Sequence, residues 1–158
     1  MSGADGSIPT LVDWAGGPPA MARLIDAFYD RVERDDLLSP FFPGGVTTEH
    51  RRNVALWWTE VFGGPSDYSD RLGGYDRMLA HHRGLSITAH QRLRFATTMS
   101  QAADDAGLPA DPEFRAALVS YLEWGTRLAM GNSQPDARPP EHAPVPRWGW
   151  GVAPPYRP

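Results

Sequence analysis

Residues 16–32, GGPPAMARLIDAFYDRV, contain the pattern that decides the fold. Two glycines and two prolines open the stretch, and proline suits the first turn of a helix because its missing N–H would have no partner there. Apolar side chains then recur at steps of three and four residues, which places them on one helical face. They are Met21, Leu24, Ile25, Phe28 and Val32. The stretch therefore predicts an amphipathic helix that packs against a core.

A second helix is expected from about Thr48 to Phe62, after a segment broken by Pro40, Pro43 and two glycines. Residues 66–87 have a mixed pattern interrupted by glycines and indicate at most one short helix, at 75–82. The face that the second helix would turn inward consists of His50, Val54, Trp57, Trp58 and Val61.

Two further helices have clear start signals. Thr88 can cap a helix, and Gln91 three residues later completes a capping box; this helix is expected to end at Gly107. Asp111 can cap the next helix, with Pro112 at its first position. Because only a short turn joins the two helices, we expect them to pack antiparallel.

No segment alternates apolar and polar residues for long enough to predict a strand, so the expected fold class is all-α. Residues 1–17 are Gly-rich and weakly patterned, and we interpret them as an N-terminal extension. The helical domain is expected to span residues 18–131. A chain of 158 residues has room for one such domain with one core.

The remaining residues, 132–158, are rich in proline and are expected to form a C-terminal extension. This composition favours a disordered tail. Trp148, Trp150 and Tyr156 are costly to leave in water, however, so an extended strap that lies over the body is the alternative.

The composition excludes several classes of site. The chain has no cysteine, which excludes disulfides, zinc–thiolate sites and cysteine nucleophiles. All 15 basic residues are arginine, so a Schiff-base lysine and a P-loop lysine are excluded as well. The net charge of −4, with basic residues scattered among acidic ones, argues against nucleic-acid binding. No apolar run approaches the roughly 20 residues of a membrane span, and the N-terminus lacks signal-peptide features, so we expect a cytoplasmic protein.

Two adjacent histidines, His81 and His82, stand in the stretch DRMLAHHRGLSIT at residues 76–88. Leu85 and Ile87 give His82 an apolar flank, whereas His81 looks more exposed, so the pair reads as a polar turn with a possible metal ligand. His50 and Tyr29 also meet apolar stripes. Taken alone, each of these two is more often an ordinary core residue with its polar atom bonded or at the rim.

In their order and spacing these segments resemble the truncated haemoglobins, most closely the second group, over about residues 10–130. The segments that carry the resemblance are the Gly-Gly turn and helix ending in Phe-Tyr, DDLLSPFFP at 35–43, VFGGPSDYSDRLGG at 61–74 and HRGLSIT at 82–88. No single motif among them is specific. The resemblance implies a 2-on-2 helical sandwich that binds haem b.

Carried over position by position, the resemblance implies that His82 is the proximal iron ligand. It assigns the distal tyrosine to Tyr29 and the distal-helix position nearest the iron to His50. The candidate partners of the haem propionates are His81, Arg77 and Arg83. The other implied haem contacts are Phe42, Val54, Trp57, Trp58, Leu85, Phe95 and Met99.

Two positions depart from the second group. That group commonly has a small residue where His50 stands, and a histidine there is more like the third group. It also commonly has a tryptophan, facing the bound ligand, where this chain has Phe95. Because phenylalanine has no N–H, we expect His50 to act with Tyr29 as the second hydrogen-bond donor to the ligand.

The resemblance implies a globin for oxygen binding or transport, or for another diatomic ligand such as nitric oxide or CO. A hydrogen bond to a charged group is worth roughly 1.5–3 kcal/mol. Two such bonds from Tyr29 and His50 would slow dioxygen release by about two orders of magnitude or more, which favours a holder or reactor of dioxygen over a quick-release carrier.

Other functions stay open at this point. The same pocket fits an enzyme with nitric oxide dioxygenase activity, supplied by an unknown reductase, or with peroxidase-like activity in which His50 is the acid–base residue. A haem-free helical interaction module, with the Pro- and Trp-rich tail as its partner-binding strap, is the more remote alternative. A homodimer is compatible with any of them.

Overall fold

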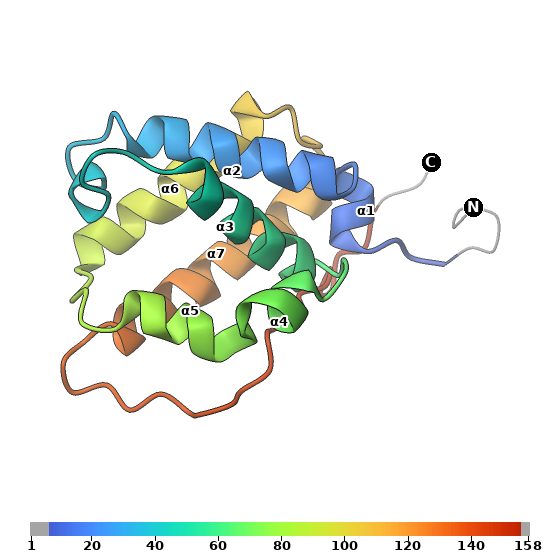
Figure 1. Ribbon diagram of the computed structural model, residues 1–158. Coiled ribbons are helices and arrows are strands. Elements are labelled where there is room, and N and C mark those ends of the chain that lie inside the picture. Colours follow the sequence, from blue (N-terminus) through green and yellow to red (C-terminus); the bar gives the residue numbers. More distant parts are fainter. Residues whose placement is uncertain (1–6, 156–158) are drawn as a thin grey trace.

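The computed structural model describes residues 7–155, and the regular secondary structure within that range consists of helices alone, as expected (Figure 1). The elements are α1 (Leu11–Ala15), α2 (Pro18–Val32), the 3-10 turn η2 (Ser39–Phe41), α3 (Thr48–Val61), α4 (Asp67–Leu72), α5 (Gly74–His82), α6 (Ala89–Asp105) and α7 (Pro112–Asn132). None of the helices in the described part of the chain is long and apolar enough to cross a membrane.

The four longest helices form two packed pairs. Helix α2 packs against both α3 and α6, and α6 packs against α7 (Figure 1). The shorter α4 joins the end of α3 to α5, and α5 reaches the body through α4 and α7.

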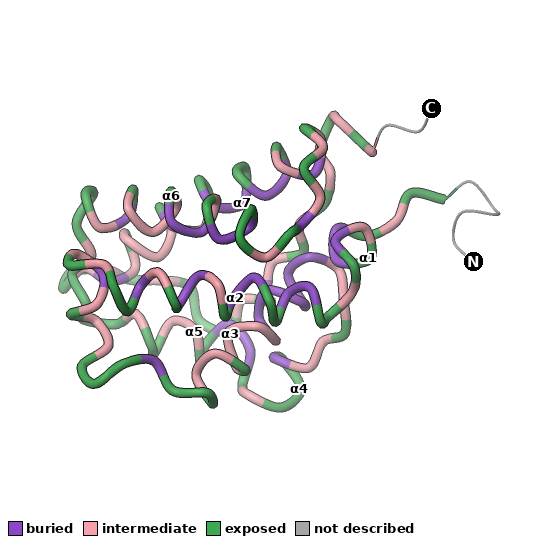
Figure 2. The backbone as a smooth tube through the Cα atoms, turned by 90° about the horizontal axis from the view of Figure 1, so that it is seen from above, coloured by how far each residue is buried: buried purple, intermediate pink, exposed green. Residues whose placement is uncertain are grey.

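The apolar stripe of residues 16–32 is the buried face of α2, and the burial pattern repeats along that helix in Figure 2. The expected caps are also present. Thr88 and Gln91 exchange two hydrogen bonds, of 2.9 and 3.1 Å, in a full capping box. The Asp111 carboxylate accepts from the N–H of Phe114 at 2.9 Å. Local sequence signals therefore start both helices where the sequence predicted.

Two short helices were not predicted. Helix α1 lies inside the weakly patterned N-terminal segment, where Leu11 and Val12 are buried against the core. Helix α4 lies in the region where only one short helix was expected; the other, α5, agrees with the prediction for 75–82. Helices of five and six residues are too short to show a helical period in the sequence.

The C-terminal residues 133–155 form an extended strap, which was the alternative to a disordered tail. Figure 1 shows the strap passing below α5 and α4 and then rising towards α1. The backbone N–H of Trp148 donates to the carbonyl of Val61 at 2.7 Å. The indole N–H groups of Trp148 and Trp150 donate to the carbonyls of Ala117 and Pro9. Tyr156 lies outside the described residues.

Candidate functional site

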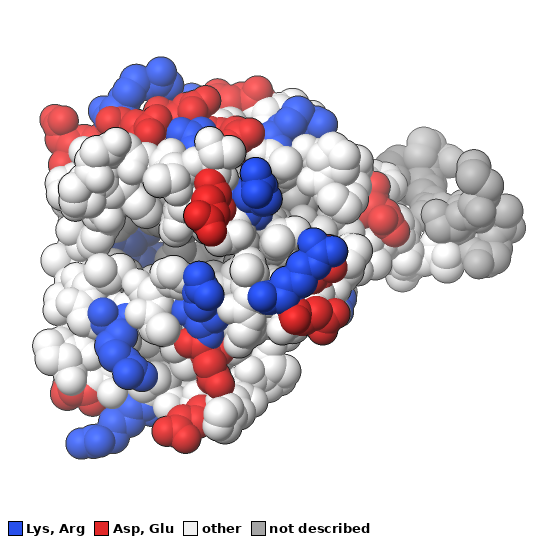
Figure 3. Space-filling model, viewed as in Figure 1, with Lys and Arg blue, Asp and Glu red and all other residues white. Residues whose placement is uncertain are grey.

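A cavity of about 390 Å³ opens between α3 and α5 and reaches inward to α6 and α7. The space-filling view in Figure 3 shows this face hollowed, with mostly uncharged atoms around the hollow. Nearly all of the residues expected to contact haem line the cavity. They are Tyr29, Phe42, His50, Val54, Trp57, Trp58, His81, His82, Leu85 and Phe95.

Met99 is the exception. It follows Phe95 by one helical turn on α6, but its side chain is fully buried in the core and does not line the cavity. At that turn α6 packs directly on α2 and α7, so the methionine fills the space between the helices. The structure therefore does not place Met99 at the cavity, unlike the other residues expected to contact haem.

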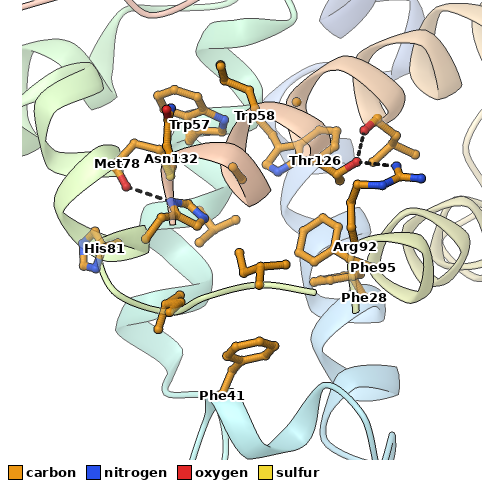
Figure 4. Close-up of a pocket in the computed structure, with 18 of the residues that line it drawn as sticks. Phe28, Phe41, Trp57, Trp58, Met78, His81, Arg92, Phe95, Thr126 and Asn132 are labelled. Carbon is orange, nitrogen blue, oxygen red and sulfur yellow. Dashed lines mark hydrogen bonds between the residues drawn. The ribbon is translucent and has the colours of Figure 1, made fainter. Parts of the chain in front are cut away.

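His82 stands at the C-terminal end of α5 and faces the cavity. Its Nδ1 lies 2.8 Å from the carbonyl oxygen of Met78, a bond drawn as a dashed line in Figure 4. Because a carbonyl can only accept, Nδ1 carries the hydrogen and Nε2 keeps its lone pair. Burial lowers the pKa of His82, although the bond to Met78 opposes this effect. His82 therefore presents a neutral, oriented imidazole nitrogen to the cavity.

The loop after His82 is tied to the end of α7. The backbone N–H of Ser86 donates to the carbonyl of Ser133 at 3.0 Å, and the N–H of Ile87 donates to the Ser133 hydroxyl at 2.9 Å. The amide of Gln134 donates to the carbonyl of Ile87. These bonds hold an otherwise exposed loop in place, and so limit where the end of α5 can move.

His81 lies at the rim of the same wall and is exposed. The Nε–H of Arg77 donates to His81 Nε2 at 3.0 Å, one turn away on α5. Burial lowers the pKa of His81, and the neighbouring Arg77 lowers it further. The adjacent histidines thus differ as the sequence indicated: His82 turns inward and His81 stays at the edge.

Across the cavity, Tyr29 on α2 and His50 on α3 meet through a hydrogen bond of 3.0 Å between Oη and Nε2. The Thr47 hydroxyl caps α3 by accepting from the N–H of His50, which fixes the start of that helix. The ring of Phe42 lies 5.4 Å from both the Tyr29 and the His50 rings. Tyr29 and His50 therefore form a compact polar pair next to aromatic side chains.

The protonation of this pair follows from its surroundings. Burial raises the pKa of Tyr29, so the phenol keeps its hydrogen at neutral pH. Burial lowers the pKa of His50, and His81 and His82 lower it further, so the imidazole is neutral. The pair therefore shares one hydrogen in its mutual bond. When His50 is the donor, the Tyr29 hydrogen is free for a molecule in the cavity.

Phe95 occupies the inner wall, where its ring lies 4.7 Å from that of Phe28. It offers no hydrogen bond. Trp57 has an indole N–H, but that group donates to the hydroxyl of Tyr121 at 3.0 Å and is not available to the cavity. Tyr29, His50 and Asn53 are polar residues that line the cavity from α2 and α3, and Tyr29 and His50 are the two joined by a hydrogen bond.

Sequence reasoning missed several lining residues. Arg92 is buried, and its Nη1 donates to the Thr126 hydroxyl at 3.0 Å and pairs with Glu123 (Figure 4). A signal for it existed, because Arg92 precedes Phe95 by three residues on the same helical face. Other lining residues that were not predicted as site residues come from α4, α5 and α7; they include Tyr68, Tyr75, Met78, Leu79, Tyr121 and Asn132.

Residues 10–125 match the family model described as bacterial-like globin. The Group 2 truncated hemoglobin YjbI of Bacillus subtilis is 30% identical over 122 residues, which cover 77% of this chain and 89% of that protein. A Group 1 truncated hemoglobin, GlbN of Nostoc sp., is 29% identical over 109 residues, which cover 69% of this chain and 87% of that protein.

Solved structures agree. The Group II truncated hemoglobin of Bacillus anthracis superposes with a TM-score of 0.71 at 28% identity, covering 80% of this chain and 94% of that chain. The hemoglobin of Chloroflexus aurantiacus gives a TM-score of 0.68 at 30% identity, covering 77% and 98%. These neighbours have the 2-on-2 helical arrangement seen here. The chain belongs to the bacterial-like globin family and, within it, to the truncated haemoglobins.

Proposed function

We propose that this globin binds haem b through His82 and holds a diatomic ligand, dioxygen in the first place, beside Tyr29 and His50. One observation carries the proposal. A free imidazole nitrogen and a hydrogen-bonded Tyr–His pair face each other across a single apolar cavity. The family implies haem binding, and the named residues give that binding a geometry.

The residues present fit haem. A histidine binds haem iron through an unprotonated ring nitrogen, and the neutral, oriented imidazole of His82 meets this condition. The cavity walls are mainly aromatic and aliphatic, as a porphyrin face requires. Within residues 7–155 no cluster of three or more histidine or carboxylate side chains forms a bare metal site.

His82 would hold the iron of a bound haem, and the haem would supply a metal atom that can bind a small ligand. The role of Tyr29 is to present its hydroxyl hydrogen to that ligand. His50 supports it by donating Nε2–H to the tyrosine oxygen, which leaves the hydroxyl hydrogen free. A hydrogen bond of this kind to a charged group contributes roughly 1.5–3 kcal/mol.

Of the residues considered for the propionates, His81 and Arg77 have the best support. They are hydrogen-bonded to each other at the rim, and His81 lines the cavity. Arg77 keeps its positive charge in any physiological condition. The pair therefore offers a cation and an imidazole at the edge where charged groups of a bound haem would meet water.

A second candidate function is the reduction of peroxide in the same cavity. It is favoured by His50, a neutral, half-buried imidazole that can accept a proton from one peroxide oxygen and return it to the other. Comparing peroxide consumption by the wild type with that of His50→Leu tests this candidate. Equal consumption would rule out a role for His50.

The test of the main proposal is a haem titration followed by absorption spectra in the ferric, ferrous and CO-bound forms. We expect the wild type and His81→Ala to bind one haem with a Soret band, and His82→Ala to lose the wild-type spectra. An unchanged spectrum in His82→Ala would overturn the assignment of the ligand. A wild-type protein without any Soret band would leave the haem-free interaction module as the remaining hypothesis for the function.

A further inference from the structure

Aromatic rings in contact lead from the cavity to the protein surface. Trp57 and Tyr121 both line the cavity, and the indole N–H of Trp57 donates to the Tyr121 hydroxyl at 3.0 Å. The Tyr121 ring lies 5.4 Å from that of Trp148 and 6.2 Å from that of Trp124, measured between centroids. Trp58 also lines the cavity, and its ring lies 5.0 Å from that of Tyr121, so four tryptophans are linked through one tyrosine.

The outer end of this series of aromatic rings is a pair of indoles at the surface. The rings of Trp124 and Trp148 lie 5.4 Å apart at 35°, and Trp124 is 41% exposed. Trp124 comes from α7 and also borders the cavity, whereas Trp148 comes from the C-terminal strap. The bond from the Trp148 indole to Ala117 and its backbone bond to Val61 hold the strap's indole against α7.

The chemistry of these side chains suits electron transfer. Indole and phenol rings are the neutral side chains that lose an electron most readily, and rings in van der Waals contact exchange electrons quickly. Burial raises the pKa of Tyr121, so its phenol keeps its hydrogen and its ring acts as a bridge between tryptophans. Trp57 and Trp148 then form the inner and outer ends of a continuous path.

We propose that Trp124 and Trp148 form a surface oxidation site for phenols or aromatic amines too large to enter the cavity. The oxidant is hydrogen peroxide reduced in the cavity, so the inference rests on the proposed haem site. One peroxide and two donors give two waters and two donor radicals. The O–O bond breaks, each donor loses one electron and one proton, and the electrons pass inward through Tyr121 and Trp57.

A second indole pair provides an internal control. Trp14 and Trp150 also join a body residue to a strap residue, their centroids lie 5.6 Å apart, and both are partly exposed. Within residues 7–155 the other ring contact of this pair is from Trp150 to Phe114, a phenylalanine that is hard to oxidise. Neither indole of the control pair lines the cavity.

The first experiment treats the haem-loaded full chain with hydrogen peroxide, digests it and maps oxidised tryptophan by mass spectrometry. We expect oxidation at Trp124 and Trp148, with Trp14 and Trp150 largely unmodified. Equal oxidation of both pairs would mean diffusing radicals and would overturn the proposal. So would a haem-loaded protein in which neither Trp124 nor Trp148 is modified.

The second experiment compares peroxide-driven oxidation of a free phenol with that of the same phenol coupled to dextran, which cannot enter the cavity. The double variant Trp124→Phe/Trp148→Phe is expected to lose most of its rate with the dextran phenol relative to the free one. The matched Trp14→Phe/Trp150→Phe variant should keep the wild-type ratio of rates. An unchanged ratio in the first variant would overturn the surface site.

The two proposals fail in different ways. A wild type that shows no haem spectrum overturns the proposed function and this inference with it. A normal haem spectrum, combined with random tryptophan oxidation or an unchanged ratio of rates, overturns only the surface site.

Discussion

The two walls of the cavity are built differently. The α2/α3 wall, which includes Tyr29 and His50, belongs to the packed body and is tied internally by hydrogen bonds. The α5 wall, which includes His82 and the loop 83–87, contacts the body through α4 and α7, and Leu85 in its loop is 42% exposed. Three hydrogen bonds from Ser133 and Gln134 hold that loop.

This difference indicates which of the two walls a bound haem would stabilise. Parts of a protein with few buried contacts open at lower free energy than the core does. A ligand that binds only the closed form raises the free energy of opening by RT ln(1 + c/Kd), where c is its free concentration. Haem attached to His82 would therefore stabilise the α5 wall, whereas the α2/α3 wall is organised without it.

The largest expected effect is on amide hydrogen exchange in α5. With haem at about 1,000 times its Kd, exchange that needs release of haem should slow by roughly three orders of magnitude. Amides of α2 should change far less, because core packing already protects them. Exchange mass spectrometry of the haem-free and haem-loaded protein measures both. Equal slowing of amide exchange in the two walls would contradict the proposed difference between them.

The second-largest effect is expected on the rate of dioxygen release in the variant Tyr29→Phe. This substitution removes only the hydroxyl and keeps the ring between Phe28 and Phe42, so the packing is preserved. Loss of a hydrogen bond worth roughly 1.5–3 kcal/mol should speed dioxygen release by about 10- to 100-fold. Laser photolysis or stopped-flow mixing gives the rate.

His50→Leu is the matched change on the same wall. It should speed release less than Tyr29→Phe does, because the tyrosine hydrogen remains. A release rate that is unaltered in Tyr29→Phe would show that this hydroxyl does not face the ligand.

The difference between the two walls can also be tested by a substitution outside the cavity lining. Ser133→Ala removes a buried hydroxyl that accepts from Ile87 N–H and donates to the carbonyl of Met130. Leaving this partly buried N–H without its partner should cost about 1 kcal/mol, measurable by urea unfolding, and haem should dissociate faster. Ser120→Ala, at an exposed position of α7, is the control. Equal rates of haem dissociation in both variants would argue against a role for Ser133 in holding the loop 83–87.

The smallest effect is expected at the outer edge of the α2/α3 wall. Arg51 bridges the helices by pairing with Asp30 at 2.8 Å and Glu33 at 3.0 Å. These carboxylates are considerably exposed, so Arg51→Met should cost only about 1 kcal/mol or less, and less still at high salt. Urea unfolding at low and high salt tests this. A large, salt-independent loss would mean that Arg51 stabilises the wall through packing of its side chain and not through these ion pairs.

Much of the fold was predictable because its signals are local. The apolar stripe of α2, the Thr88–Gln91 capping box and the Asp111 cap act within a few residues, and each stands where expected. The choice of His82 over His81 came from its apolar flank and the family resemblance, and the two side chains do face differently. The role of His82 as iron ligand stays a prediction.

What the sequence could not predict depends on distant contacts. Ser133 lies 46 residues from the Ile87 that it holds, and no local pattern relates them. Met99 shares a face with Phe95, yet the packing of α6 on its neighbours decides that only Phe95 reaches the cavity. The strap likewise has no periodicity, and its course is set by tryptophan contacts with helices far away in the chain.

The central claim is that His82 is the axial ligand. Its most direct test is His82→Gly, which leaves room for free imidazole in place of the side chain. We predict that the variant lacks the wild-type ferrous spectrum and that added imidazole restores it, while His81→Gly needs no imidazole. A His82→Gly protein with the wild-type spectrum in the absence of imidazole would contradict the account.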